Sequence, residues 1–217
     1  MWVKICGVRT VEAARQLAVL RPDAIGLNFY VPSSRCVDEE TAAAIVDLLP
    51  DSVEPIGLFV NHTLDDVLQT ARRLDLRTVQ LHGDESPEFV AEVCRAGLNV
   101  IRAFRVGEEG LGEVVDTLKR YAELEITLRA CLIDARVKDA FGGTGKTAPW
   151  DVLRTGWKYD WPPLVLAGGL TPANVCDAIQ AVNPWGVDTA SGVEADTGMQ
   201  DVDLMQGFIA SARGCSE

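Results

Sequence analysis

PLVLAGGLTPANV, residues 163–175, joins an apolar run to two glycines and then to a helix start signal. The run is rich in Val and Leu and has no polar alternation, which favours a strand buried on both faces. Thr171-Pro172 puts an N-cap residue before a first-turn proline, so a helix is expected to begin there. The stretch therefore predicts a strand, a glycine loop and a helix in direct succession.

The same succession recurs along the whole chain. The predicted strands are WVKIC, AIGLNF, EPIGLFV, TVQLH, NVIRAF, ACLID, PLVLAGG and GVDTA. The predicted helices between them include VEAARQLAVL, EETAAAIVDLL, TLDDVLQTARRL after the cap Thr63, a segment capped at Ser86-Pro87, and EEGLGEVVDTLKRY. Eight strand–helix units in 217 residues predict an α/β fold, a (β/α)8 TIM barrel with parallel strands. An open doubly wound sheet would normally use fewer strands. Because no linker-like segment divides the chain, we expect one domain over residues 1–217.

Composition narrows the classes of partner. Hydrophobic residues make up 47% and charged residues 24%, as in ordinary soluble domains. The formal net charge is −12, with 20 basic against 32 acidic residues, which argues against nucleic acid as a partner. No apolar run approaches the roughly 20 residues of a membrane helix, and the N-terminus has no signal-peptide pattern. We expect a cytoplasmic protein that holds any anionic ligand with local backbone N–H groups.

Cysteine and histidine usage does not suggest a metal site. Six cysteines lie at positions 6, 36, 94, 131, 176 and 215 without a CxxC pair, and the chain has two histidines. This spacing lacks metal-ligand signatures, so no metal site is expected from it. Most of the thiols are expected to be buried core residues or inert surface residues. Cys6 is the possible exception.

AFGGTGKT, residues 140–147, has the look of a nucleotide-binding P-loop. That motif requires a glycine five positions before Gly145, and this chain has Ala140 there. No second nucleotide motif is evident. The loop is therefore expected to hold a different kind of phosphate.

Polar residues gather where the predicted strands end, which is where barrels carry their chemistry. Cys6 suits either a base with a lowered pKa or a small core residue. Asp134 suits either a general acid or a cap. His82 suits a structural hydrogen bond better than catalysis, and Arg35 could grip a carboxylate or remain solvated.

Three glycine-bearing loops follow the last three predicted strands. Glycine permits close approach of the backbone to a ligand, and successive N–H groups can surround an anion. Several such loops at one edge favour a sugar phosphate over ATP, because loops after strands seven and eight of barrels often bind phosphate. The three loops are GGTGKT, LAGGLTP and SGVE.

These blocks together resemble the phosphoribosylanthranilate isomerase family. The resemblance covers about Val3 to Ile209 and is carried by KICGVRT, DAIGLNFYVPSSRCV, PIGLFVN, VQLHGDES, GGTGKT, LAGGLTPANV and GVDTASGVE. It implies a TIM-barrel enzyme of tryptophan biosynthesis. The implied reaction is the Amadori rearrangement of N-(5-phosphoribosyl)anthranilate to 1-(2-carboxyphenylamino)-1-deoxyribulose 5-phosphate, without a cofactor or a metal. The implied assembly is a monomer or a homodimer.

The resemblance also implies roles for individual residues. Cys6 corresponds to the general base, Asp134 to the general acid, and Arg35 to the residue that contacts the anthranilate carboxylate. His82 and Asp188 are expected to contact the substrate. The family's phosphate site corresponds to Gly143, Thr144, Gly145, Gly168, Gly169, Ser191 and Gly192.

Two blocks depart from the family pattern. SPRYV is Ser33-Ser34-Arg35-Cys36-Val37 here, and DVSSGVE is DTASGVE over residues 188–194. Other phosphosugar barrels, from histidine biosynthesis or indole-glycerol-phosphate chemistry, are competing interpretations, as is a non-catalytic phosphate-binding module. The single KICG block argues against the histidine-type isomerases, for which paired aspartates are expected. The presence of both Cys6 and Asp134 argues against a non-catalytic module.

Overall fold

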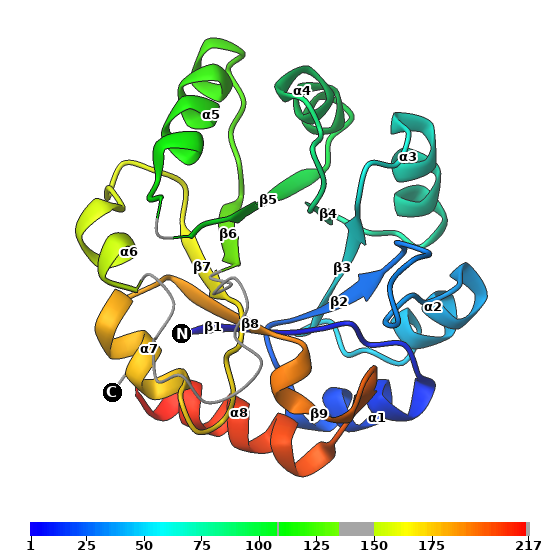
Figure 1. The fold of residues 1–217 in the computed structure, drawn as a ribbon. Helices are drawn as coiled ribbons and strands as arrows, with labels where there is room; N and C mark the ends of the chain where they lie inside the picture. The colour runs from blue at the N-terminus through cyan, green and yellow to red at the C-terminus, as the bar shows by residue number, and fades with distance from the viewer. Residues whose placement is uncertain (108, 135–149, 216–217) are drawn as a thin grey trace.

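A computed structural model of the chain describes residues 1–107, 109–134 and 150–215. Strands β1 to β8 form a closed barrel in the order β1-β2-β3-β4-β5-β6-β7-β8, and all pairings within the barrel are parallel. Figure 1 shows helices surrounding the strands. The predicted (β/α)8 barrel is confirmed.

Every predicted strand is present, with ends that move by at most a few residues. The strands are β1 Trp2–Cys6, β2 Ala24–Asn28, β3 Glu54–Phe59, β4 Thr78–Leu81, β5 Asn99–Arg105, β6 Ala130–Asp134, β7 Leu164–Ala167 and β8 Gly186–Thr189. Two short strands after β8, β9 Glu194–Asp196 and β10 Met199–Gln200, pair antiparallel and were not predicted.

The helices follow the strands in turn. They are α1 Val11–Leu20, α2 Glu39–Val46, α3 Leu64–Arg73, α4 Pro87–Arg95, α5 Gly112–Glu123, α6 Trp150–Gly156, α7 Val175–Val182 and α8 Val202–Gly214. The predicted caps at Thr63 and Ser86 are confirmed, because their hydroxyls accept hydrogen bonds from the N–H groups of Asp66 and Phe89. The segment expected to form a helix from EEGLG onward begins its helix only at Gly112.

The predicted helix start at Thr171 is wrong by several residues. The helix α7 begins at Val175, and Asn174 is its N-cap residue, without a side-chain cap bond. The Asn174 amide accepts a hydrogen bond from the Thr171 N–H at 2.7 Å and donates to the Gly169 carbonyl at 3.0 Å. The residues between therefore form a turn that ties the glycine loop to the helix.

Alternation along the strands divides the core into two layers. Side chains facing the helices form the larger apolar cluster, whereas Ile56, Ile101, Leu132, Val165 and smaller residues fill the barrel interior. Because successive strand residues face opposite sides, Asp134 shares the interior face of β6 with Leu132. On β1, Lys4 and Cys6 share the face of Trp2, which packs against the interior cluster.

The end of the barrel where the strands begin is closed by aromatic and charged contacts. The rings of Trp2 and Trp185 stack with centroids 5.0 Å apart. Glu54 Oε1 accepts hydrogen bonds from Thr78 at 2.6 Å and from Arg129 Nη1 at 2.6 Å. This lower end, defined by Trp2, Glu54, Thr78, Arg129 and Trp185, lies opposite the end at which parallel strands present a site.

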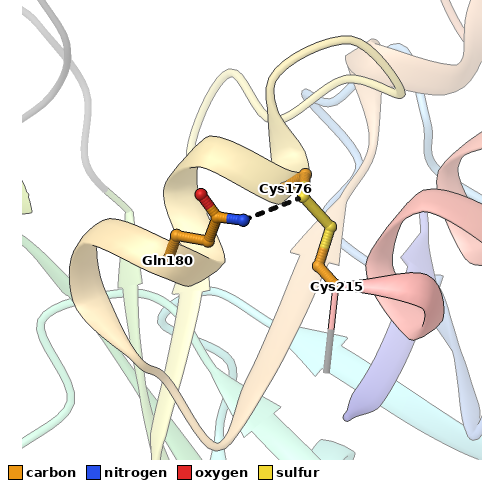
Figure 2. The surroundings of a disulfide bond; sticks show 3 residues. All are labelled: Cys176, Gln180 and Cys215. Atoms are coloured by element: carbon orange, nitrogen blue, oxygen red, sulfur yellow. Dashed lines mark hydrogen bonds between the residues drawn. A yellow bond between two sulfur atoms is a disulfide. The ribbon is translucent and has the colours of Figure 1, made fainter. Parts of the chain in front are cut away.

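A disulfide links the outer helical layer. Cys176 in α7 and Cys215, directly after α8, are bonded, and Gln180 Nε2 lies 3.7 Å from the Cys176 sulfur (Figure 2). Nothing in the sequence indicated this pairing, and Cys176 and Cys215 are exceptions to the expectation that most thiols are core or inert surface residues. The described free cysteines are Cys6, Cys36, Cys94 and Cys131. Of the helices in the described ranges, none combines the length and apolar character needed to cross a membrane.

Candidate active site

Three strands bring ionisable side chains to the interior of the barrel mouth. Cys6 ends β1, Asp134 ends β6, and Asp188 lies on β8. Closure of the barrel places Lys4 opposite Asp188 in the β1–β8 register. Lys4 Nζ donates a hydrogen bond to Asp188 Oδ1 at 2.8 Å, and the Lys4 side chain is completely buried.

Cys6 is almost enclosed, with 7% of its surface exposed. Burial raises the pKa of its thiol, and the Lys4 ammonium and the Gly7 N–H oppose that increase, whereas Asp188 adds to it. For the Lys4 ammonium, burial lowers the pKa, but Asp188 and Cys6 outweigh burial and raise it overall. The ammonium is therefore charged at neutral pH beside the thiol.

Asp134, at the end of β6, is the third of these ionisable side chains at the barrel mouth. In barrel order, β8 and β7 separate β6 from β1. Burial raises the pKa of the Asp188 carboxyl against the influence of Lys4, and the charge of Asp134 raises it further. Asp134 and Asp188 are thus electrostatic neighbours, and the predicted acid and base lie at the same end of the barrel.

Arg35 lies over the first strand end but is already paired. Its Nε and Nη2 donate to the two carboxylate oxygens of Glu194 at 2.6 and 2.7 Å. Gly7 has a positive φ of 76°, and a Cβ there would lie 2.6 Å from Arg35 Cδ. Glycine at position 7 therefore lets the Arg35 side chain pack against the end of β1.

His82 is held at the end of β4 by backbone and side-chain contacts. Its N–H donates to the Phe59 carbonyl at 2.9 Å, and its Nδ1 lies 3.1 Å from Gln80 Nε2. Arg102 secures the following loop, donating to the Gly83 carbonyl at 2.9 Å and to Glu85 Oε2 at 2.8 Å. Arg102 thus supports the loop after His82.

The glycine loops after β7 and β8 are joined to each other. Gly168 and Gly169 have positive φ values of 88° and 69°, a backbone region that favours glycine. The Thr189 hydroxyl donates to the Leu170 carbonyl at 2.7 Å, and a Cβ at Gly192 would overlap that carbonyl. Ser191 and Gly192 form a 3-10 turn in this position. The predicted Gly143, Thr144 and Gly145 lie outside the described residues.

Sequence reasoning placed Lys4 and Glu194 near strand ends but assigned neither a role in the site. Lys4 had a visible signal, since it is a charged residue inside the otherwise apolar run WVKIC. Glu194 ends the SGVE block, but nothing in the sequence pairs it with Arg35, from which 159 positions separate it. Both partners depend on closure of the barrel.

The mouth combines a thiol and a carboxyl group with loops whose geometry suits an anion. Within the ranges 1–107, 109–134 and 150–215, no group of three or more His, Cys, Asp or Glu side chains is arranged to hold a metal ion. A thiol and a carboxyl can exchange protons with a bound substrate, and paired glycine loops can hold its phosphate. This arrangement is typical of phosphate-binding (β/α)8-barrel enzymes that use acid–base catalysis.

Comparison with known proteins specifies the family. The family model described as N-(5'phosphoribosyl)anthranilate (PRA) isomerase matches residues 3–211, and the chain belongs to this family. An N-(5'-phosphoribosyl)anthranilate isomerase of Geotalea uraniireducens is 44% identical over 212 residues, which cover 98% of each chain.

Solved structures agree in fold over almost the full length. A crystal structure of phosphoribosyl anthranilate isomerase from Thermotoga maritima is 36% identical, with a TM-score of 0.85 and 98% of each chain covered. A crystal structure of a phosphoribosyl anthranilate isomerase in complex with reduced 1-(o-carboxyphenylamino)-1-deoxyribulose 5-phosphate is 34% identical, with a TM-score of 0.80 and 98% of each chain covered.

Proposed function

We propose that this chain converts N-(5-phosphoribosyl)anthranilate to 1-(2-carboxyphenylamino)-1-deoxyribulose 5-phosphate with Cys6 as general base and Asp134 as general acid. The observation that carries the assignment is the placement of both groups at one barrel mouth, beside the joined glycine loops. The complex of a family member with a reduced form of this product supports the same substrate class. The isomerisation is a step of tryptophan biosynthesis.

The first step opens the furanose ring. Asp134, in its neutral form, donates a proton to the ring oxygen, and the bond between that oxygen and the anomeric carbon breaks. The electron pair of the anthranilate nitrogen forms the C=N bond of a Schiff base. A carboxyl group suits this task when its surroundings favour the protonated form.

The second step moves hydrogen from carbon. The Cys6 thiolate removes the C2′ proton, and the electron pair of that C–H bond shifts to give the enolamine. The enolamine then tautomerises to the ketone product. Proton transfers of this kind, by positioned side chains, typically contribute about 10²–10⁴-fold to the rate.

The anionic groups of the substrate are assigned to two flanking parts of the mouth. The phosphate is placed at Gly168, Gly169, Ser191 and Gly192, which fixes the substrate far from the reacting carbon. Arg35 is assigned to the anthranilate carboxylate, which would share or replace the fork contact with Glu194. His82 and Asp188 remain predicted substrate contacts, and Asp188 also binds Lys4.

The remaining assignments concern the whole molecule. We place residues 1–217 in one catalytic domain that acts in the cytoplasm as a monomer or a homodimer. The ligand is the small phosphosugar-anthranilate, with no nucleic acid or membrane partner. The charge of −12 supports the exclusion of nucleic acid.

A coupled assay tests the reaction and the two roles. Phosphoribosylanthranilate is generated in situ, and its fluorescence decay is followed. The wild-type protein is expected to turn the substrate over rapidly, and Cys6→Ser and Asp134→Asn should each lower kcat by at least about 10²-fold. Cys94→Ser, which alters a half-buried thiol on α4, is the matched control and should leave kcat unchanged. Near-normal turnover in either site variant would remove that residue from its role.

A further inference from the structure

Lys4 is the buried cation of the barrel mouth, and the proposed reaction steps do not use it. Its side chain is 0% exposed, and its Nζ donates one hydrogen bond, to Asp188 Oδ1 at 2.8 Å. Burial of an ammonium is costly unless nearby groups compensate for the lost water. An apolar residue at this inward position would avoid that cost, so the retention of lysine calls for a function.

The ammonium and the Cys6 sulfur border the same small space. Gly26 is the Cα partner of Cys6 in the β1–β2 register. A Cβ at Gly26 would lie 2.6 Å from Cys6 Sγ and 3.2 Å from Lys4 Nζ. The absence of a side chain at Gly26 therefore leaves the sulfur and the ammonium room to interact, and the charge of the Lys4 ammonium opposes the effect of burial on the pKa of the Cys6 thiol.

We propose that Lys4 is a positioning residue for Cys6: its ammonium, fixed between strands by Asp188, stabilises the thiolate and orients it toward the substrate. This inference deepens the proposed function and rests on Cys6 as the base. Lys4 acts through the sulfur and does not touch the reacting carbon. Asp188 then has a defined part, because it holds the ammonium in place across the β1–β8 seam.

Among the charged groups around Cys6, Lys4 is the one that most favours the thiolate. Burial disfavours the thiolate, and the carboxylate of Asp188 disfavours it further. Arg35 also faces Cys6, but its fork is bound to both oxygens of Glu194. Asp134 is a second carboxyl beside Asp188. Among these described groups, the Lys4 ammonium is the cation that borders the space beside Gly26 together with the sulfur.

A thiolate titration separates this role from simple support of the β1–β8 pairing. Absorbance at 240 nm is followed against pH. The absorbance curve of the same protein carrying Cys6→Ala is subtracted, because Cys36, Cys94 and Cys131 also titrate. In Lys4→Gln with Asp188→Asn, two amides replace the ion pair at similar volume. The pKa of Cys6 should increase by at least about one unit, so the thiolate fraction at neutral pH falls at least about tenfold.

The single variant Asp188→Asn should shift the titration in the opposite direction. It removes the carboxylate that disfavours the thiolate while the ammonium remains, so the pKa of Cys6 should decrease. A purely structural contact predicts no such reversal of sign. In the double variant, the acid limb of the pH profile of kcat/KM should move to higher pH together with the absorbance titration.

Two results would overturn the inference. One is an unchanged Cys6 titration in the folded double variant, with folding checked by its thermal midpoint. The other, which applies even if the double variant does not fold, is an unchanged or increased pKa of Cys6 in Asp188→Asn. Failure of the proposed function would give a different result. An active Cys6→Ser enzyme would remove Cys6 as the base, whereas the thiolate titrations of the proteins that retain Cys6 would not change.

Discussion

The two ends of the barrel both carry a lysine or arginine bound to a carboxylate, but the surroundings of the two pairs differ. At the lower end, the side chains of Arg129 and Glu54 are 26% and 22% exposed, and Thr78 donates a further hydrogen bond to Glu54. At the mouth, Lys4 is 0% exposed and Asp188 9%, and their neighbours are a thiol and a second carboxyl.

The difference in burial changes what each pair can do to its neighbours. Partly solvated pairs contribute little to stability because water competes for both partners. A buried pair costs desolvation energy, and it perturbs the pKa of each neighbour within its reach. Ion-pair distance alone therefore does not identify the site, whereas burial and the identity of the third group do.

The largest expected effect is a loss of stability when a disulfide of the outer helical layer is removed. This disulfide belongs to neither end of the barrel. The disulfide Cys176–Cys215 spans 39 residues of sequence, and a loop of that length gives about 4 kcal/mol by chain entropy. Cys176→Ser should lower the free energy of unfolding by roughly that amount in non-reducing denaturation, with kcat unchanged. The wild-type protein under reducing conditions should match the variant; equal stability of oxidised wild type and variant would contradict the prediction.

The next effect tests whether the joined glycine loops hold the phosphate. A Cβ in Gly192→Ala would overlap the Leu170 carbonyl and displace the loop after β7. A misplacement of about 1 Å can cost about 10²-fold in rate, so kcat/KM should fall on that scale, mainly through KM. Gly112→Ala is the control, since its Cβ would meet no atom within 4 Å. Equal kinetics for the two variants would remove Gly192 from the phosphate site.

A smaller effect is expected at the Arg35–Glu194 pair. Arg35→Ala should increase KM by about tenfold, the scale of one lost hydrogen bond to a charged group, while kcat changes less. Glu194→Gln retains Arg35 but weakens the pairing of Arg35 with position 194. An unchanged KM in Arg35→Ala would exclude the contact with the anthranilate carboxylate.

The smallest effect belongs to the lower end. Glu54→Gln should decrease the free energy of unfolding by about 1 kcal/mol, because the pair is partly solvated, and it should leave kcat and KM as in the wild type. Urea denaturation and the coupled assay measure the two quantities on the same sample. A change in kcat beyond about twofold would mean that the two ends are not separable in the way their surroundings indicate.

Local features of the chain could be predicted well. The eight apolar runs are strands, and the hydroxyls of Thr63 and Ser86 cap their helices. These features depend on residues within a few positions of one another, so composition and spacing carry the signal. The Thr171 prediction was wrong because the Asn174 side chain binds the Thr171 N–H and the Gly169 carbonyl, which makes a turn where a helix start was expected.

Contacts between distant residues required the tertiary structure. Motif order along the chain already pointed to Cys6, Asp134 and the glycine loops, because parallel strands of a barrel end at one face. The pairing of Lys4 with Asp188 spans 184 positions, that of Arg35 with Glu194 spans 159, and the disulfide spans 39. Which partners meet depends on the β1–β8 register and on the packing of α7 against α8. Local residue preferences carry no information on either, since both arise only when the barrel closes.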